Sequence, residues 1–182
     1  MLGELWSFQG RFKTLHLTWF AFFLTFVVWF NLAPLATTVK ADMGLTVSQI
    51  RTIAICNVAL TVPARVVIGM LLDKFGPRIT YSAILLFAAI PCLLFATAQD
   101  FSQLVVARLL LSIVGAGFVI GIRMVAEWFP PKEIGLAEGI YGGWGNFGSA
   151  FSALTLVIVA GWLSFAGGAQ IGDVVLNWRA AI

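Results

Sequence analysis

Long apolar runs separated by short polar stretches make up most of this sequence. A helix needs about 20 consecutive apolar residues to cross a bilayer, and five runs reach or approach that length. They cover residues 15–39, 50–72, 80–98, 102–126 and 135–165. The pattern therefore predicts an all-α membrane protein with about five transmembrane helices. The last residues, from Asn177 to Ile182, read like the approach to a sixth helix, so we expect the chain to be truncated before or at that helix.

The composition supports this prediction. Apolar residues make up 60% of the chain and charged residues only 10%, with a mean hydropathy of +0.99, whereas soluble domains carry about 25% charged residues. The net charge of +3 is therefore no sign of a nucleic-acid partner, and the expected surroundings are the lipid bilayer. Cys56 and Cys92 fall inside apolar runs, which is typical of small core residues rather than of a disulfide or a metal site. We expect neither a metal nor a cofactor.

Basic residues between the runs indicate the orientation, because short cytoplasmic loops are enriched in Lys and Arg. An N-terminus in the cytoplasm places Arg11, Lys13, Lys74, Arg78 and Lys132 inside, and Lys40, Arg51 and Arg179 outside. This bias favours a cytoplasmic N-terminus. The first run is too long for the core of a signal peptide, so we expect it to be a retained helix.

Arg65 is the most costly residue, because it lies near the middle of the second run, where a charge costs roughly 2.5–3.5 kcal/mol. It either pairs with a carbonyl or carboxylate of a neighbouring helix or binds an anion. We favour an anion site, because no Asp or Glu occurs at matching depth and the guanidinium offers two parallel donors to a flat oxyanion. Arg108 and Arg123 lie nearer to helix ends, where they can reach the interface or pair across helices, and contact with the substrate is the less favoured alternative for both. Glu127, one turn after Arg123, is its expected partner.

A glycine-rich stretch, residues 142–148, interrupts the last run with the sequence GGWGNFG. Gly142 and Asn146 fall on one helix face, together with Gly135, Gly139 and Ser149, while Trp144 points away. Two interpretations stay open for this face. Small residues let a neighbouring helix pack closely, or they expose the backbone beside an amide that donates to an anion.

The polar turn after the second run resembles the signature loop of the major facilitator superfamily, G-x-x-x-D-[RK]-x-G-x-[RK]. The match falls on Gly69, Asp73, Lys74, Gly76 and Arg78. In that superfamily the loop follows helix 2 on the cytoplasmic side and takes part in locking the conformational switch. Other parts of the chain that resemble the superfamily are Arg108 with Gly115 and Gly117 on helix 4, and Trp178–Arg179 at the entry to helix 6.

Within the superfamily, the stretch 142–148 is similar to the helix 5 signature of the nitrate/nitrite porter family, and the resemblance to cyanobacterial-type nitrate permeases extends over the whole chain. It includes Pro63-Ala64-Arg65 on helix 2 and Trp128-Phe129-Pro130 after helix 4. The resemblance implies a twelve-helix fold of which residues 1–182 form the N-terminal transmembrane half-domain. It also implies that Arg65 clamps the anion, that Asn146 and the backbone near Gly142 lie beside it, and that Phe118 supplies a pocket wall. The partner of this half would be the missing C-terminal half, which carries a second binding arginine.

The expected function is secondary transport of nitrate, nitrite or both by alternating access in the full-length protein. Uptake against a negative interior costs about 2.3 kcal/mol per charge per 100 mV, so anion exchange or proton symport must drive it. His16, the only histidine, lies at the edge of helix 1, and the sequence points to no proton carrier at mid-membrane. The alternatives are a facilitator for another small organic anion or a sugar, an inactive fragment, or a membrane sensor. An enzyme is not expected, because no convergent set of nucleophile, base or metal ligands occurs.

Overall fold

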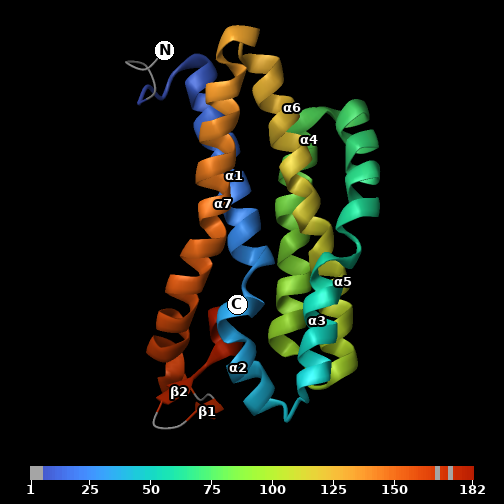
Figure 1. Ribbon diagram of the computed structural model, residues 1–182, viewed down its shortest axis with the longest axis vertical. Helices are drawn as coiled ribbons and strands as arrows, with labels where there is room; N and C mark the ends of the chain where they lie inside the picture. Colours follow the sequence, from blue (N-terminus) through green and yellow to red (C-terminus); the bar gives the residue numbers. More distant parts are fainter. Residues whose placement is uncertain (1–5, 167–168, 172–173) are drawn as a thin grey trace.

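The computed structural model describes residues 6–166, 169–171 and 174–182. Within them the chain forms a bundle of long helices with a two-stranded sheet at one end (Figure 1). The elements in chain order are α1 (Gly10–Trp29), α2 (Leu32–Asp42), α3 (Val47–Ala59), α4 (Thr61–Thr97), α5 (Phe101–Ser112), the 3-10 helix η2 (Ile113–Ala116), α6 (Gly117–Trp128), α7 (Pro131–Trp162), the 3-10 helix η3 (Leu163–Ala166), β1 (Ala169–Ile171), β2 (Val174–Leu176) and α8 (Trp178–Ala181).

Four helical segments of the described chain are long and apolar enough to cross a membrane. They are Gly10–Asp42, Val47–Thr97, Phe101–Trp128 and Pro131–Trp162. The second segment has 51 residues, far more than one crossing needs. At 1.5 Å per residue, the other segments are long enough to cross once each. The protein is therefore an integral membrane protein.

The first predicted helix, 15–39, is divided in two, with α1 ending at Trp29 and α2 beginning at Leu32. Pro34 explains the break, because it has no backbone N–H to donate to the carbonyl of Phe30. That carbonyl accepts instead from the amide of Ala33, at 3.1 Å. The tighter turn separates the two helices while the chain continues in the same direction (Figure 1).

The longest helix, α4, reverses direction at Gly76. This glycine has φ 76° and ψ 166°, a backbone conformation that residues other than glycine rarely adopt. Pro77 starts the next helical turn, where its missing N–H costs nothing, and Thr80 Oγ1 donates to the Gly76 carbonyl at 2.8 Å. The chain consequently rises through α3 and the first half of α4 and descends through the second half (Figure 1). The 3-10 turn η2 similarly joins α5 to α6 inside the fourth predicted helix, 102–126.

The polar, glycine-containing stretch after α7 holds β1 and β2, which form an antiparallel pair with Ala169 opposite Leu176 and Ile171 opposite Val174. The chain then enters α8, whose Asn177 side chain accepts from the amide of Ala180 at 3.2 Å. The sheet and α8 lie at the end of the bundle opposite the N-terminus (Figure 1).

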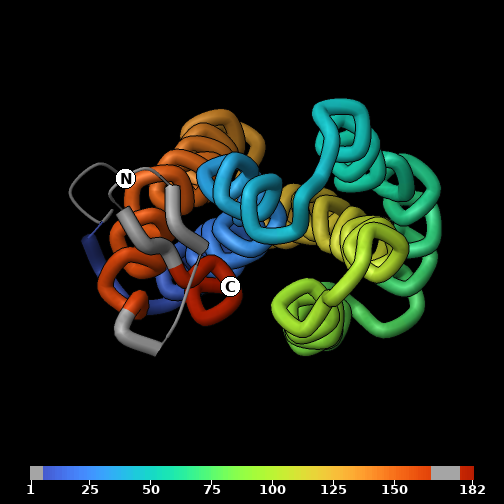
Figure 2. Tube along the Cα trace, turned by 90° about the horizontal axis from the view of Figure 1, so that it is seen from below, coloured from blue at the N-terminus to red at the C-terminus, as the bar shows by residue number. Residues whose placement is uncertain are grey.

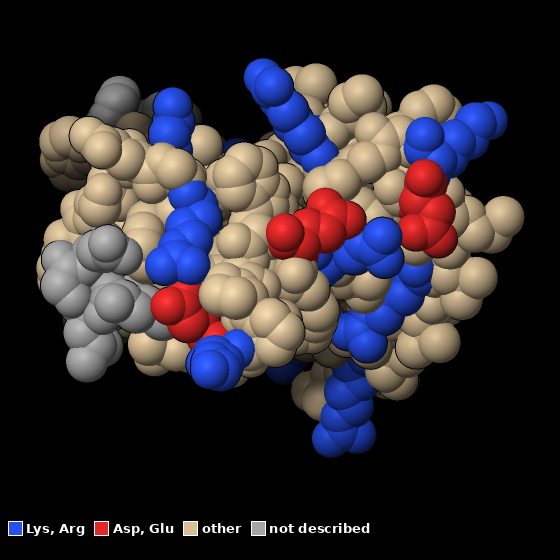
Figure 3. All heavy atoms as spheres, turned by 90° about the horizontal axis from the view of Figure 1, so that it is seen from above, with Lys and Arg blue, Asp and Glu red and all other residues tan. Residues whose placement is uncertain are grey.

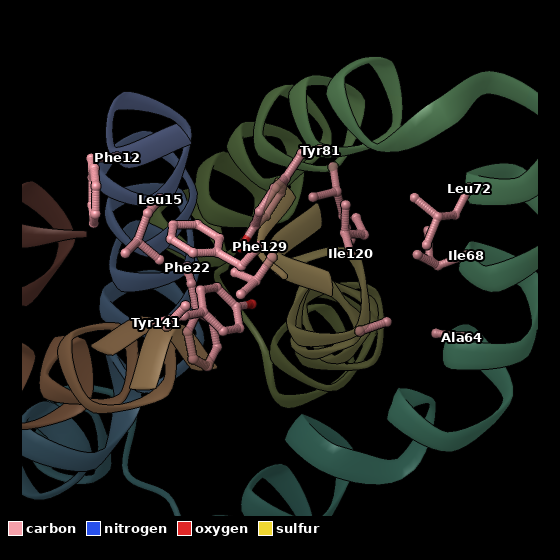
Figure 4. Packing of buried hydrophobic residues seen from close by; sticks show 14 residues of the cluster. Phe12, Leu15, Phe22, Ala64, Ile68, Leu72, Tyr81, Ile120, Phe129 and Tyr141 are labelled. Carbon is pink, nitrogen blue, oxygen red and sulfur yellow. The ribbon is translucent and has the colours of Figure 1, made fainter. Parts of the chain in front are cut away.

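The core joins α1 to α4, α6 and α7. Seen along the bundle, α1 and α2 lie between α7 and the group formed by α3 to α6 (Figure 2). Phe22 on α1 stacks on Tyr141 of α7, with ring centroids 4.9 Å apart, and both are completely buried. Figure 4 shows these rings beside Tyr81 and Ile120, which come from α4 and α6. Inside a bilayer helices associate through van der Waals packing, because lipid is as apolar as the core, and the contacts of these large side chains fix the positions of the four elements.

Candidate anion-binding site

Arg65 lies on the first half of α4 and is exposed. Its neighbours Ala64 and Ile68 are buried in the core, so the helix turns Arg65 away from the bundle. In the part of the chain that the structure describes, Arg65 makes no hydrogen bond or ion pair. A carboxylate partner, the structural alternative to an anion site, is therefore not found among these residues.

The face of α7 that carries Gly142 and Asn146 is open. A Cβ built on Gly135, Gly139, Gly142 or Gly143 has no neighbouring atom within 4 Å. Asn146 is exposed, and its Nδ2 donates to the Gly142 carbonyl at 2.7 Å. The amide has a second N–H that this bond does not use, so it has a donor left for a ligand.

Helix packing uses other glycines of the same stretch. A Cβ on Gly145 would lie 1.7 Å from Cδ1 of Phe22, and one on Gly148 would lie 2.3 Å from the carbonyl oxygen of Phe23. The close approach of α1 to α7 therefore depends on Gly145 and Gly148. Packing therefore occurs at Gly145 and Gly148, whereas the backbone is open at Gly135, Gly139 and Gly142, on the face for which both interpretations were considered.

Phe118, the predicted pocket wall, lies on α6 and is half-buried. Its ring lies 5.3 Å from that of Phe22 and 6.0 Å from that of Tyr141. The hydroxyl of Tyr141 also donates to the Phe118 carbonyl, at 3.0 Å. Phe118 is thus held firmly in place at the edge of the core.

The structure does not bring all four predicted residues together. Gly142 and Asn146 are in contact, but Arg65 lies on α4, on the other side of α1 and α6 from α7 (Figures 1 and 2). Among the described residues no hydrogen bond or ion pair links Arg65 to Asn146. The predicted site is therefore distributed over two exposed helices that flank the centre of the bundle.

Arg108 belongs to a buried polar network whose other members, Asn57 and Trp29, the sequence did not indicate. Arg108 on α5 is 0% exposed, and its guanidinium lies 3.8 Å from the centroid of the Phe95 ring. Its Nη1 donates to Oδ1 of Asn57 at 3.3 Å. Asn57 in turn donates to the Trp29 carbonyl at 3.0 Å and accepts at its own carbonyl from the Trp29 indole at 2.7 Å. Of the alternatives for Arg108, the structure shows the contact across helices.

The expected ion pair between Arg123 and Glu127 is confirmed, at 2.6 Å. It belongs to a collection of charged side chains at the end of the bundle that carries the N-terminus (Figure 3). There Arg11 also pairs with Glu133 at 2.6 Å, which links the first turn of α1 to the first turn of α7. At the same end lies the loop that resembles the superfamily signature, Gly69, Asp73, Lys74, Gly76 and Arg78, with its three charged side chains exposed.

A second polar cluster ties α8 to the opposite end of the bundle. The indole of Trp178 donates to Oδ2 of Asp42 at 2.9 Å, and Arg179 pairs with the same oxygen at 3.5 Å. Arg179 also donates to the carbonyl of Ala96 at 3.0 Å. The residues resembling the entry to helix 6 therefore hold the ends of α2 and α4 together.

Comparison with known proteins decides the family. Residues 18–182 match the family model of the Major Facilitator Superfamily. The chain belongs to this superfamily. The resemblance to this superfamily inferred from the loop is thereby confirmed, and the helices described above are a partial facilitator fold.

Nitrate transporters are among the relatives of this facilitator chain. It is 65% identical over 197 residues to the nitrate/nitrite transporter NrtP of Picosynechococcus sp., and 62% identical over 183 residues to NrtP of Nostoc punctiforme. It is also 30% identical to the high-affinity nitrate transporter 2.3 of Oryza sativa, over 86% of its length. The two cyanobacterial alignments cover 100% of this chain but only 37% and 35% of the relatives. The chain thus corresponds to their N-terminal part.

Proposed function

We propose that this chain is the N-terminal half of a nitrate and nitrite transporter that works by alternating access. The observation that carries the proposal is an exposed, unpaired guanidinium near the middle of a spanning segment, in a chain similar over its whole length to two nitrate/nitrite transporters. A charge in this place requires a partner. The anion and the C-terminal half of the transporter are the proposed partners.

The depths of Arg65 and Asn146 support one shared site. Residue 61 is the middle of the ascending segment 47–75, so Arg65 lies about 6 Å from that point at 1.5 Å per residue. Asn146 is at the middle of α7, Pro131–Trp162. The hydrocarbon core extends about 15 Å to either side of the midplane. Both residues therefore fall in its central part, where facilitators place their substrates between two halves.

Each predicted residue has a distinct role in this proposal. Arg65 offers two parallel N–H donors to the planar anion, a geometry that a single ammonium lacks. Asn146 supplies its free N–H, and the open backbone at Gly142 lets the anion approach the helix closely. Phe118, held by its contacts with α1 and α7, closes one side of the cavity and keeps water from competing for the anion.

The orientation and the membrane also belong to the proposal. Basic residues gather at the end of the bundle that carries the N-terminus (Figure 3), which favours the cytoplasmic side of the cell membrane. The signature loop around Gly76 then lies in the cytoplasm. We propose that it locks the transporter in one state, with Asp73, Lys74 and Arg78 exposed to a partner in the other half.

The test replaces Arg65 by Lys in the full-length transporter, with Arg51→Lys as the matched control. Both arginines are exposed, but Arg51 lies in the second turn of α3, far from the middle of its segment. Losing one of two charge-assisted hydrogen bonds costs about 1.5–3 kcal/mol. We therefore expect the KM for nitrate to rise roughly 10- to 100-fold for Arg65→Lys and to stay unchanged for Arg51→Lys.

The measurement is uptake of isotopically labelled nitrate into proteoliposomes, in competition with nitrite and with small organic acids. Inhibition by nitrite but not by organic acids is the expected pattern. Wild-type uptake by Arg65→Lys would contradict the clamp, and stronger competition by organic acids would assign the site to another anion.

A further inference from the structure

Glu138 is a carboxyl group inside the helix that carries the proposed anion site. It lies on α7, one turn before Gly142 and two turns before Asn146, at the border between the open face of Gly142 and the face that packs on α1. Gly135 and Gly139 flank it, and the space beside these glycines is open. Glu138 is half-buried, so the open side of α7 places a titratable group beside the path of the anion.

Glu138 makes no hydrogen bond or ion pair with any part of the chain that the structure describes. The charged or titratable groups near it, or on elements packed against α7, are engaged elsewhere or lie at other points of the bundle. They are Arg11, which pairs with Glu133; Arg123 and Glu127, which pair with each other; Arg179, which pairs with Asp42; His16, which accepts from Trp19; Tyr141, which donates to Phe118; and Lys13 and Lys40. A carboxylate in a spanning helix without a cation has one inexpensive way to lose its charge, which is to bind a proton.

The charge of Glu138 affects an anion bound at Asn146. Eight residues of helix separate the two side chains, which corresponds to about 12 Å along the axis. At that distance, with an effective dielectric constant of about 20, a carboxylate weakens the binding of an anion roughly tenfold. A proton on Glu138 removes this repulsion. Proton binding and anion binding consequently favour each other, and this coupling is reciprocal.

We propose that Glu138 is the proton-binding site that couples anion uptake to proton entry. The carboxylate takes up one proton when the cavity is open to the outside and releases it when the cavity is open to the cytoplasm. One O–H bond forms and later breaks, and no other bond changes. Because one proton cancels the charge of one anion, the membrane potential no longer opposes entry. This inference rests on the proposed anion site at Arg65 and Asn146.

The test compares full-length wild type with Glu138→Gln, with Glu133→Gln as the control. Glu133 is also on α7 but pairs with Arg11 in the first turn. Proteoliposomes containing a pH-sensitive dye report nitrate-driven acidification, and exchange of labelled nitrate for nitrite at equal pH on both sides reports anion movement alone. Glutamine resembles the protonated carboxyl in shape and charge, so the exchange step does not need the proton.

Wild type and Glu133→Gln are expected to acidify on addition of nitrate and to bind nitrate about tenfold more tightly once Glu138 is protonated. Glu138→Gln is expected to lose the acidification, to bind nitrate equally well at all pH values and to continue exchange. Acidification by Glu138→Gln, or loss of exchange together with acidification, would overturn the role of Glu138. Wild-type exchange without acidification would overturn only this inference, whereas absence of nitrate exchange in wild type would overturn the proposed function as well.

Discussion

The contact between α1 and α7 leaves no room for a methyl group at Gly148. A Cβ at this position would lie 2.3 Å from the carbonyl oxygen of Phe23 and 3.0 Å from Cβ of Phe26. The first of these atoms belongs to the backbone, so no side-chain rotation relieves the clash. Gly148→Ala must therefore push the two helices apart. Gly143→Ala is the matched control, because a Cβ there has nothing within 4 Å.

Two effects of opposite sign determine the result. Replacing a helical glycine by alanine stabilises a soluble helix by about 1 kcal/mol, and both variants gain this contribution. Overpacking a close contact costs typically about 1–3 kcal/mol, and only Gly148→Ala has this cost. The difference between the variants isolates the packing term, so Gly148→Ala should be less stable than Gly143→Ala by about 1–3 kcal/mol. For a protein of this size that corresponds to roughly 2–12 °C in Tm.

The assay is thermal unfolding of the detergent-purified protein, followed by tryptophan fluorescence. Trp19 and Trp144 lie across the same contact, with ring centroids 5.5 Å apart, so their emission reports separation of α1 from α7. We expect the Tm of Gly148→Ala to be lower than that of Gly143→Ala. Equal Tm values for the two alanine variants would refute the assignment of packing to the Gly148 face.

Two further predictions concern the polar clusters. Asn57→Ala removes the side chain that bonds both Trp29 and Arg108, and leaving their buried groups unsatisfied should lower the free energy of unfolding by about 3 kcal/mol; a Tm equal to that of wild type would contradict the network. Asp42→Asn breaks the ion pair with Arg179. The side chains of Asp42 and Arg179 are 31% and 36% exposed, so the free energy of unfolding should fall by less than about 1 kcal/mol. A larger fall in Tm would show that Asp42 stabilises α8 by more than charge.

The sequence predicts the spanning helices well because bilayer thickness fixes the length of an apolar run. It does not predict where those helices break. The separation of α1 from α2 depends on how the Phe30 carbonyl is satisfied once Pro34 removes its donor, and η2 lies in a stretch with no proline at all. The spacing of apolar residues predicts neither the break between α1 and α2 nor the 3-10 turn η2.

The sequence likewise indicates some features of the candidate site, whereas others depend on how the helices pack. Arg65 was identifiable because a charge in mid-membrane is rare, and Asn146 because it interrupts an apolar run. The role of each glycine was not identifiable, since small residues occupy two faces of α7 and only the position of α1 distinguishes them. The partner of Arg108 likewise depends on the relative heights of α1, α3 and α5, which no single segment encodes.

The two faces of α7 also determine where this molecule can bend. Backbone atoms of α1 and α7 touch at Gly148, and an ion pair joins their first turns, so we expect these helices to move as one rigid body. Sliding between them would require the contact at Gly148 to open. We therefore expect a change in access to the membrane centre to occur along the open face of α7, where Gly142 and Asn146 lie.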